Sequence, residues 1–260
     1  MKSYSHAGFT VHQLPALRDN YIYLIESGDA LACVDPAEDA PVNRACKELG
    51  RGLTHILNTH HHWDHTDANL ALKARHGCEI VGFAGDAERI PGLDRGVGEE
   101  EVVTLGDIGA RVMVTPGHTR GHVCYLMDDA LFCGDTLFGA GCGRLFEGTP
   151  EMMWNSLEKL MRLPEETRIY CAHEYTVNNL EFCMARVSDD ERIRSRLESA
   201  RKLRERGEPT VPSTMGEEMR TNPMLLPADS EFRRRFAATH GLPPDPLSVF
   251  THIRRMRDAW

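Results

Sequence analysis

The chain has 260 residues, 41% of them hydrophobic, and a formal net charge of −9. This length and apolar content are enough to bury a large core, so we expect one large domain or a domain with an appendage. The acidic balance argues against a nucleic-acid partner, because phosphate neutralisation needs a concentrated basic face. No run of about 18 apolar residues is present, so no membrane span is expected.

The N-terminus and the cysteines indicate the compartment. Residues 1–11 lack the apolar core of a secretory signal. The eight cysteines are scattered without a Cys-x-x-Cys pair, in a chain too large to depend on disulfides, so reduced thiols are expected. We therefore expect a cytoplasmic protein, and we expect it to be a monomer.

The first strong pattern is a short apolar run, residues 53–58, which predicts a strand. It leads into Thr59-His60-His61-His62-Trp63-Asp64-His65. In extended backbone, side chains two apart point the same way, so His60 and His62 can close on one ion. Asp64 and His65 project differently and could serve a second ion. An exposed polar turn is the plainer alternative, but so many imidazole and carboxylate groups predict a site for a divalent metal such as zinc.

Three later strand-like runs each end near a residue of the same chemical kind. Residues 111–114 lead to His118, residues 130–133 to Asp135, and residues 168–171 to His173. Taken singly, His118 or Asp135 is equally well explained as a turn residue that bonds its own backbone. Because binding residues usually follow the ends of strands, the set together predicts one active-site edge.

Helical patterns appear among these strands and dominate after residue 175. Helices are predicted for residues 67–76 and 150–163, for two segments within 178–206, and for a last segment that begins at Asp245-Pro246. Residues 1–175 carry 15 basic and 26 acidic side chains, whereas residues 176–260 carry 15 and 13. We expect an α/β catalytic domain over residues 1–175 and a relatively basic helical domain over residues 176–260.

The ligand-type residues resemble the signature of the metallo-β-lactamase superfamily, His-x-His-x-Asp-His followed by a later His, Asp and His. It stands here as His60, His62, Asp64, His65, His118, Asp135 and His173. The likeness is closest to glyoxalase II, the hydroxyacylglutathione hydrolases, and it extends to residues 17–21, 140–149, 173–180, 209–214 and 254–258. The resemblance implies a four-layer αββα metallo-β-lactamase sandwich with a C-terminal helical appendage that binds glutathione.

The resemblance also implies how the ligands divide. His60, His62 and His118 would hold one divalent ion, Asp64, His65 and His173 the other, and Asp135 would bridge them together with a hydroxide. Zinc is favoured, with iron or manganese as alternatives. The hydroxide would attack the thioester of S-D-lactoylglutathione, giving glutathione and D-lactate, the second step of methylglyoxal detoxification. Asp64 and Asp135 would be the catalytic carboxylates, while His61 and His122 would support the ligands from outside.

Glutathione would be held by the residues that match the family's binding set. These are Arg144, Phe146, Tyr175, Arg254 and Arg257. Arg144 and Arg257 replace the lysines common in the family, which keeps the charge but changes the geometry of recognition. Phe146 lacks the hydroxyl of the tyrosine common at its position. Without the resemblance, the arginines near the end of the chain would be explained as a solvated basic helix end.

Other functions remain open at this stage. A persulfide dioxygenase of the same superfamily would use one iron held by two histidines and one aspartate. A lactonase would share the metal chemistry but not the glutathione-type C-terminal segments. A purely structural metal site is a third hypothesis, although closed structural zinc sites use four ligands without an open position.

Overall fold

The computed structural model describes residues 1–260, which form two compact units. The first unit comprises residues 1–115 and 121–134, and the second comprises residues 116–120 and 135–260. These units do not test the domain boundary expected at residue 175, which stays a prediction.

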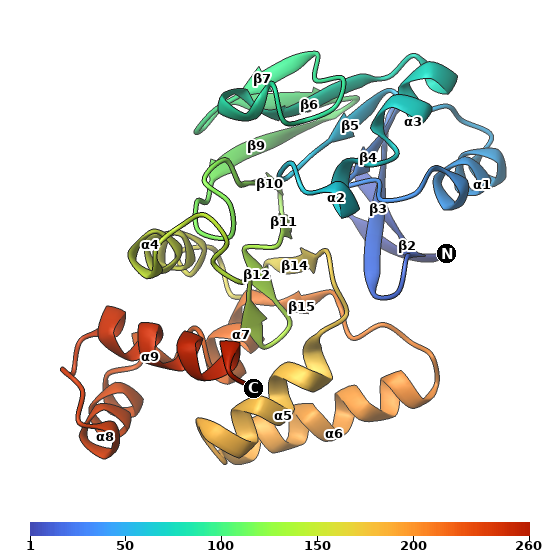
Figure 1. Cartoon of the computed structure of the whole chain (residues 1–260). Helices are drawn as coiled ribbons and strands as arrows, with labels where there is room; N and C mark the ends of the chain where they lie inside the picture. The colour runs from blue at the N-terminus through green and yellow to red at the C-terminus, as the bar shows by residue number, and fades with distance from the viewer. The chain divides into compact units, whose positions relative to one another are not determined.

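A seven-stranded sheet forms the larger sheet of the first unit (Figure 1). Its strands, in spatial order, are β1 (Lys2–His6), β2 (Phe9–Ala16), β3 (Asn20–Ser27), β4 (Ala30–Val34), β5 (His55–Leu57), β6 (Glu79–Phe83) and β7 (Arg95–Val97). The pairs from β1 to β4 are antiparallel and those from β4 to β7 are parallel. Parallel strands carry their carboxyl ends to the same edge, so the loops after β4 and β5 emerge side by side.

Helices and a second sheet cover the two faces of this sheet. The apolar face of α1 (Asp39–Leu49) and Leu72 of α3 (Asn69–His76) form one core with Leu24, Ile56 and Ile80 of the strands. Figure 1 shows both helices on the same side of the sheet. On the other side, Tyr23 of β3 packs edge-on against Phe132 of the second sheet, with ring centroids 5.6 Å apart. The first unit is therefore a helix–sheet–sheet stack, as predicted for an α/β sandwich.

The second sheet of this unit is antiparallel. Its strands are β8 (Val102–Leu105), β9 (Ile108–Val114), β10 (Val123–Met127) and β11 (Ala130–Gly134), each paired with the next. Its interior side chains are apolar and fully buried, which fits strands that lie inside a layered fold. The unit also contains the one-turn helix α2 (Trp63–Thr66) and a short 3-10 helix, Ala84–Asp86.

The second unit is mainly helical. Its helices are α4 (Pro150–Leu160), α5 (Thr176–Arg186), α6 (Glu191–Glu205), α7 (Met215–Thr221), α8 (Ser230–His240) and α9 (Pro246–Asp258), with a 3-10 turn at Leu226–Ala228. The predicted starts at Pro150 and Asp245-Pro246 are confirmed, because Thr149 and Asp245 each accept a backbone N–H in the first turn. Trp154 of α4 packs against Phe250 of α9, with ring centroids 5.6 Å apart.

Short strands accompany these helices. They are β12 (Leu137–Phe138), β13 (Gly141–Cys142), β14 (Arg168–Cys171) and β15 (Ser213–Thr214). β15 lies where the sequence predicted only helices and loops, and it pairs with β14 through Arg168–Thr214 and Ile169–Ser213. A two-residue strand is too short to leave a periodic signal, so its pairing could not be anticipated.

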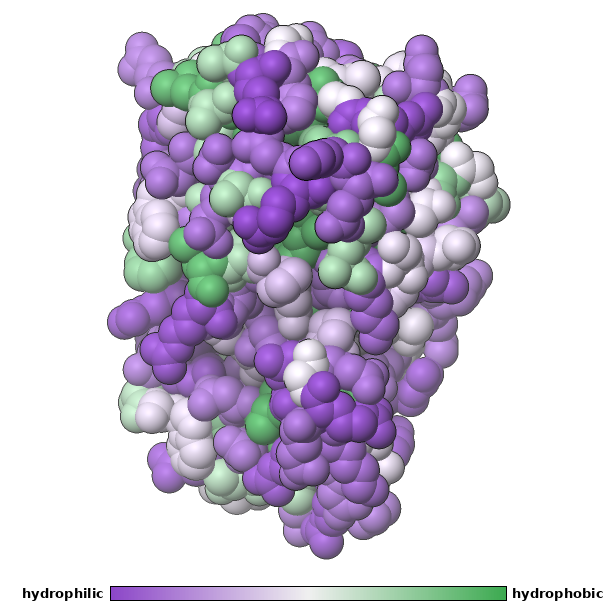
Figure 2. All heavy atoms as spheres, turned by 90° about the vertical axis from the view of Figure 1, so that its right-hand side faces the viewer, coloured by the Kyte–Doolittle hydropathy of each residue, from purple (hydrophilic) through white to green (hydrophobic).

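The surface is polar and the helices lack long apolar segments, as the composition of the chain predicts. The face of the molecule in Figure 2 is mostly hydrophilic, with hydrophobic side chains in small separate groups. None of the helices combines the length and the hydropathy that crossing a lipid bilayer would require.

The start of α9 gives a prediction about stability. The carboxylate of Asp245 accepts the backbone N–H of Ser248 at 2.9 Å, and this bond holds its pKa below the ordinary value. Asp245→Ala should lower the free energy of unfolding by about 1 kcal/mol at pH 7, as measured by urea denaturation. Because the pKa of the folded state is lowered, the effect should be complete above the ordinary pKa and disappear as the pH falls through the lowered one.

Asp245→Asn is the matched control, because asparagine also caps helices but does not ionise in this range. It should be nearly as stable as the unsubstituted chain at pH 7. Equal stability of Asp245→Ala and Asp245→Asn at that pH would show that the cap contributes nothing.

Candidate metal centre and substrate pocket

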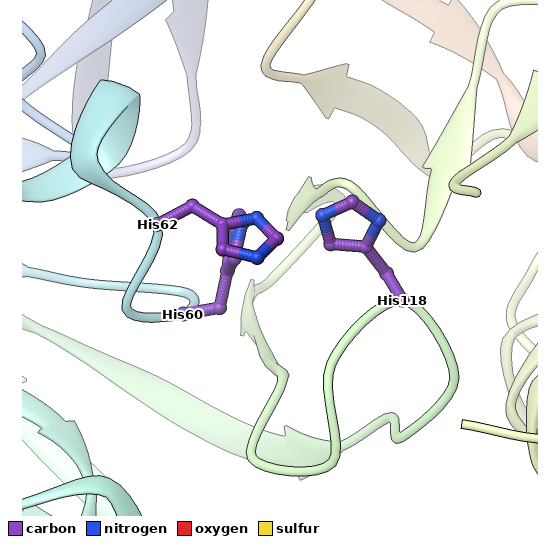
Figure 3. A group of neighbouring side chains, drawn as sticks. All are labelled: His60, His62 and His118. Carbon is purple, nitrogen blue, oxygen red and sulfur yellow. The ribbon is translucent and has the colours of Figure 1, made fainter. Parts of the chain in front are cut away.

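The loop after β5 presents two imidazoles to a common point. Nε2 of His60 and Nδ1 of His62 lie 3.0 Å apart, and His60 is fully buried. Two nitrogens bound to one tetrahedral zinc at 2.0–2.1 Å would be separated by about 3.3 Å. The spacing therefore fits ligands of one ion. Figure 3 shows these two rings together with that of His118, which comes from the loop after β9.

A change of backbone direction separates the other two ligand-type residues of this loop. α2 begins at Trp63, directly after His62, so the extended run ends before Asp64 and His65. The rings of His60 and His65 nevertheless lie close, with centroids 4.1 Å apart. Nε2 of His65 lies 3.5 Å from Oδ2 of Asp64. Asp64 is held by Asn20, whose Nδ2 donates to both its carboxylate and its carbonyl at 3.2 Å.

A buried carboxylate that the sequence analysis missed fixes this loop. Asp35, after β4, accepts the backbone N–H of Thr59 at 2.8 Å, the Thr59 hydroxyl at 2.6 Å and Nδ1–H of His65 at 3.0 Å. Its ligand atom lies within 4.8 Å of those of His60 and His65, so it belongs to a group that could hold a metal. Because its oxygens already accept these three bonds, Asp35 is better explained as the outer partner that leaves Nε2 of His65 available. The signal was present, since Asp35 also follows a strand.

The second unit gathers the other three ligand-type residues. The Oδ2 atom of Asp135 lies 3.4 Å from Nε2 of His118, and Oδ1 lies 3.4 Å from Nε2 of His173. All three side chains are buried. Each oxygen thus faces a different imidazole at about the spacing of two ligands on one ion, which is the arrangement a carboxylate needs to bridge two ions.

His118 also has an outer partner. Its Nδ1 lies 2.8 Å from the carbonyl oxygen of Arg144. A carbonyl can only accept, so Nδ1 carries the proton and the lone pair of the ring is at Nε2, the atom that faces Asp135. This bond fixes the ring for metal binding.

The two remaining histidines of the ligand loops have other partners. Nδ1 of His61 lies 3.2 Å from the buried carboxylate of Asp86, and Nδ1 of His122 lies 3.1 Å from the Thr115 hydroxyl. The ring of His122 stacks on His60 with centroids 4.9 Å apart. The supporting roles expected of both stay predictions.

A cavity of about 260 Å³ in the second unit brings together four of the five residues expected to hold glutathione. It is lined by Phe138, Cys142, Arg144, Tyr175, Asn179, Arg254, Arg257, Asp258 and Trp260. Arg254 is only 7% exposed, and its Nη2 donates to Asp258 at 2.9 Å, while its Nε–H has no partner in the chain. Burial and the neighbouring Arg254 both lower the pKa of Arg257, whose guanidinium donates to Asn178 and Asn179. Three arginines against one aspartate make the cavity suited to an anionic ligand.

Phe146 is not among the residues that line this cavity. Its ring lies edge-on to His118, with centroids 5.3 Å apart, and the Arg144 guanidinium lies 5.7 Å from its centre. It is 62% exposed. Phe146 is thus placed against a ligand-type histidine, and its apolar face is open to solvent.

Comparison with known proteins identifies the family. The family described as "Metallo-beta-lactamase superfamily" matches residues 16–173, and "Hydroxyacylglutathione hydrolase C-terminus" matches residues 174–260. A hydroxyacylglutathione hydrolase of Rhodospirillum rubrum is 48% identical over 252 residues, covering 95% of this chain and 97% of the relative. One of Methylococcus capsulatus is 50% identical over 253 residues, with the same coverage. The chain belongs to the hydroxyacylglutathione hydrolase family.

Solved structures confirm the fold class of this family member. The crystal structure of ETHE1 from Myxococcus xanthus is 26% identical, with a TM-score of 0.65 and coverage of 95% of this chain and 99% of that one. The BLEG-1 B3 metallo-beta-lactamase is similar in fold, with a TM-score of 0.63 at 23% identity and coverage of 83% and 99%. The metallo-β-lactamase fold with a C-terminal helical region, predicted from the sequence, is therefore confirmed.

The geometry around Asp35 predicts that it controls metal retention. Asp35→Asn replaces an acceptor-only carboxylate by an amide that cannot accept all three bonds, which frees the His65 ring. Metal affinity should fall by about 10–100-fold, measured as metal retained per chain during a chelator titration.

Asp94→Asn is the control for this experiment, because it changes a carboxylate of the same unit that accepts from Lys73 and from the backbone N–H of Ile80 rather than from the ligand loop. It should retain metal like the unsubstituted chain. Equal retention by Asp35→Asn would contradict the role of Asp35.

Proposed function

We propose that this chain is a dinuclear metal-dependent thioester hydrolase that cleaves S-D-lactoylglutathione to glutathione and D-lactate. The observation that carries the proposal is Asp135, whose two oxygens face two different buried histidines at 3.4 Å. The family match over residues 174–260, the part of the chain that supplies most of the cationic cavity, supports glutathione as the carrier of the acyl group.

The ligands of the proposed ions divide as the resemblance implies. His60, His62 and His118 would hold one, and Asp64, His65 and His173 the other, with Asp135 bridging. Imidazole and carboxylate sets of this kind suit zinc, which we favour over iron or manganese. When bound, such ions supply a hydroxide near neutral pH and polarise the substrate carbonyl.

The side chains of the protein then perform the remaining tasks. The outer bonds from His65 to Asp35 and from His118 to the Arg144 carbonyl hold both rings with their Nε2 lone pairs available. Asp64, itself oriented by Asn20, would align the attacking oxygen. The departing glutathione thiolate is a weak base, so the reaction needs no general acid from the chain.

The cavity arginines would bind the glutathione carboxylates. Arg254 and Arg257 carry fork-shaped donor sets that match carboxylates, and both line the cavity. Arg144 lies at the same cavity, while Tyr175 stacks on His173 with centroids 4.9 Å apart. Tyr175 therefore lies between a ligand-type residue and the glutathione pocket, where the thioester would be located. Phe146 would cover the substrate near His118.

We propose that the enzyme acts in the cytoplasm as a monomer. The reduced state of its cysteines, all eight of which are free and buried, supports a reducing compartment.

Hydrolysis of S-D-lactoylglutathione, followed as loss of the thioester absorbance, tests the function. Metal-loaded protein should be active, and removal of metal by a chelator should abolish activity until metal is restored. Asp135→Ala should lower kcat/KM by about a thousandfold or more, because both ions lose a shared ligand. Tyr4→Phe, which removes a hydroxyl that donates to Gln13 from the half-buried edge strand β1, should leave the rate unchanged.

Inactive metal-replete protein would refute the thioesterase. In that case oxygen consumption with glutathione persulfide, or hydrolysis of lactones, would identify the alternative chemistry of the superfamily. Activity that survives complete metal removal would refute the metal mechanism itself.

Arg254 provides a separate test of substrate recognition. Arg254→Ala should raise KM for S-D-lactoylglutathione by about 10–100-fold with a smaller effect on kcat, because a charge-assisted bond contributes about 1.5–3 kcal/mol. Arg255→Ala, an exposed neighbour on the same helix, is the matched control and should leave KM unchanged. An unchanged KM in Arg254→Ala would refute this assignment.

A further inference from the structure

The hairpin β12–β13 lies between the ligand Asp135 and the pocket residue Arg144. Each of its strands has two residues, with Leu137 opposite Cys142 and Phe138 opposite Gly141. A two-stranded ribbon of this size is not stable by itself. Ala140, at its turn, also has a left-handed backbone with φ of 55°, which is unfavourable for a residue with a Cβ. The position of the hairpin must therefore be set by its surroundings.

Buried side chains from three C-terminal helices bond its backbone residue by residue. Asn222, directly after α7, donates to the carbonyls of Phe138 and Gly141 at 3.2 and 3.0 Å. Glu218 of α7 accepts the N–H of Ala140 at 2.8 Å. From α5, Asn179 donates to Gly139 O at 3.0 Å, and from α9, Arg254 donates to Cys142 O at 3.0 Å. Five consecutive residues thus each have a bond to a buried side chain.

Glu218 is the centre of this network. It is fully buried, and its second oxygen accepts from Nη2 of Arg196 at 2.5 Å, while Asn222 donates to the first at 3.0 Å. Nη1 of Arg196 donates to the Thr221 hydroxyl at 2.6 Å. Burial alone would lower the pKa of Arg196, but the charge and hydrogen bond of Glu218 raise it. A buried carboxylate destabilises the folded state unless all of its hydrogen-bond partners are in place. The bond from Ala140 N–H to Glu218 is therefore held in one geometry.

The position of the hairpin determines part of the wall of the pocket. Phe138 and Cys142 line the cavity, and the carbonyl of Cys142 orients the guanidinium of Arg254. Gly139 and Gly141 pass so close to Thr176 and Asn179 that a Cβ on either would collide with those side chains. The hairpin therefore cannot shift without changing the walls of the cavity.

We propose that Glu218, supported by Arg196 and Asn222, is a positioning residue for glutathione recognition: it holds the β12–β13 hairpin and so sets the pocket and the orientation of Arg254. The inference rests on the proposed function for the identity of the ligand. It concerns substrate affinity and leaves the metal ligands unchanged.

Two double variants isolate the bond to the hairpin. Arg196→Met with Glu218→Gln removes the ion pair but keeps an acceptor for Ala140 N–H, whereas Arg196→Met with Glu218→Leu removes both. Replacing a buried ion pair by apolar groups is often neutral for stability, so both should fold. The leucine variant should show KM for S-D-lactoylglutathione raised about tenfold, kcat within threefold and unchanged bound metal. The glutamine variant should recover most of the affinity.

Binding and hydrogen exchange provide readouts that do not depend on turnover. Calorimetry with S-methylglutathione should show the same tenfold difference between the two variants. Exchange of the Ala140 amide, followed by mass spectrometry of peptides covering residues 137–145, should be faster in the leucine variant. Glu198→Gln, at an exposed position of α6, is the control and should match the unsubstituted chain in every readout.

The possible failures are distinguishable. Equal KM and equal ligand affinity in the two double variants would overturn the positioning role, as would a rise in KM that only follows a loss of thermal stability. If either double variant does not fold, Asn222→Ala keeps the ion pair, removes the bonds to Phe138 and Gly141, and should raise KM in the same way. Unsubstituted protein that neither hydrolyses the thioester nor binds S-methylglutathione would refute the proposed function instead, and the exchange of Ala140 would still report the anchoring.

Discussion

The proposed metal centre depends on one constraint: many side chains with free lone pairs must be held close together. Hydrogen bonds from partners outside the site hold these side chains in place. Imidazole nitrogens and carboxylate oxygens that converge repel one another unless a cation lies between them, so the fold has to oppose that repulsion. Asp35 does this in the first unit by accepting three bonds from the ligand loop, two from Thr59 and one from His65. A buried acceptor of this kind fixes both the path of the backbone and the tautomer of the ring.

The second unit uses a backbone carbonyl for the same purpose, and this choice joins the two halves of the proposed reaction. The carbonyl that accepts from His118 belongs to Arg144, whose side chain lines the substrate cavity. One residue therefore contacts a ligand-type histidine through its backbone and the pocket through its guanidinium. Gly143, just before it, passes so close to Asp135 and His118 that any Cβ there would meet them. Metal binding and substrate recognition thus share a short stretch of chain.

The sequence predicted what depends on local pattern and missed what depends on distant contacts. The strand ends that present His60, His118, Asp135 and His173, and the start of the last helix, could all be predicted because ligand chemistry and period are local signals. Asp35 also follows a strand, but its bonds to Thr59 and His65 could not be predicted, because these partners lie about 24–30 residues further on. Arg254 alone suggested a solvated helix end, yet it is buried against a carbonyl 112 residues away. Glu218, 78 residues from Ala140, left no signal at all.

The cysteines favour metal chemistry over a covalent route. Cys142 is the only one of the eight among the residues that line the cavity, and burial raises its pKa although Arg254 opposes the shift. Burial likewise raises the pKa of Cys171 and Cys183 to about 12. The thiolate is the nucleophilic form, so thiols kept protonated in this way cannot attack a thioester at neutral pH. A thiol nucleophile is therefore disfavoured, which agrees with the proposed hydroxide, and Cys142 contributes its backbone carbonyl, which accepts from Arg254 at 3.0 Å.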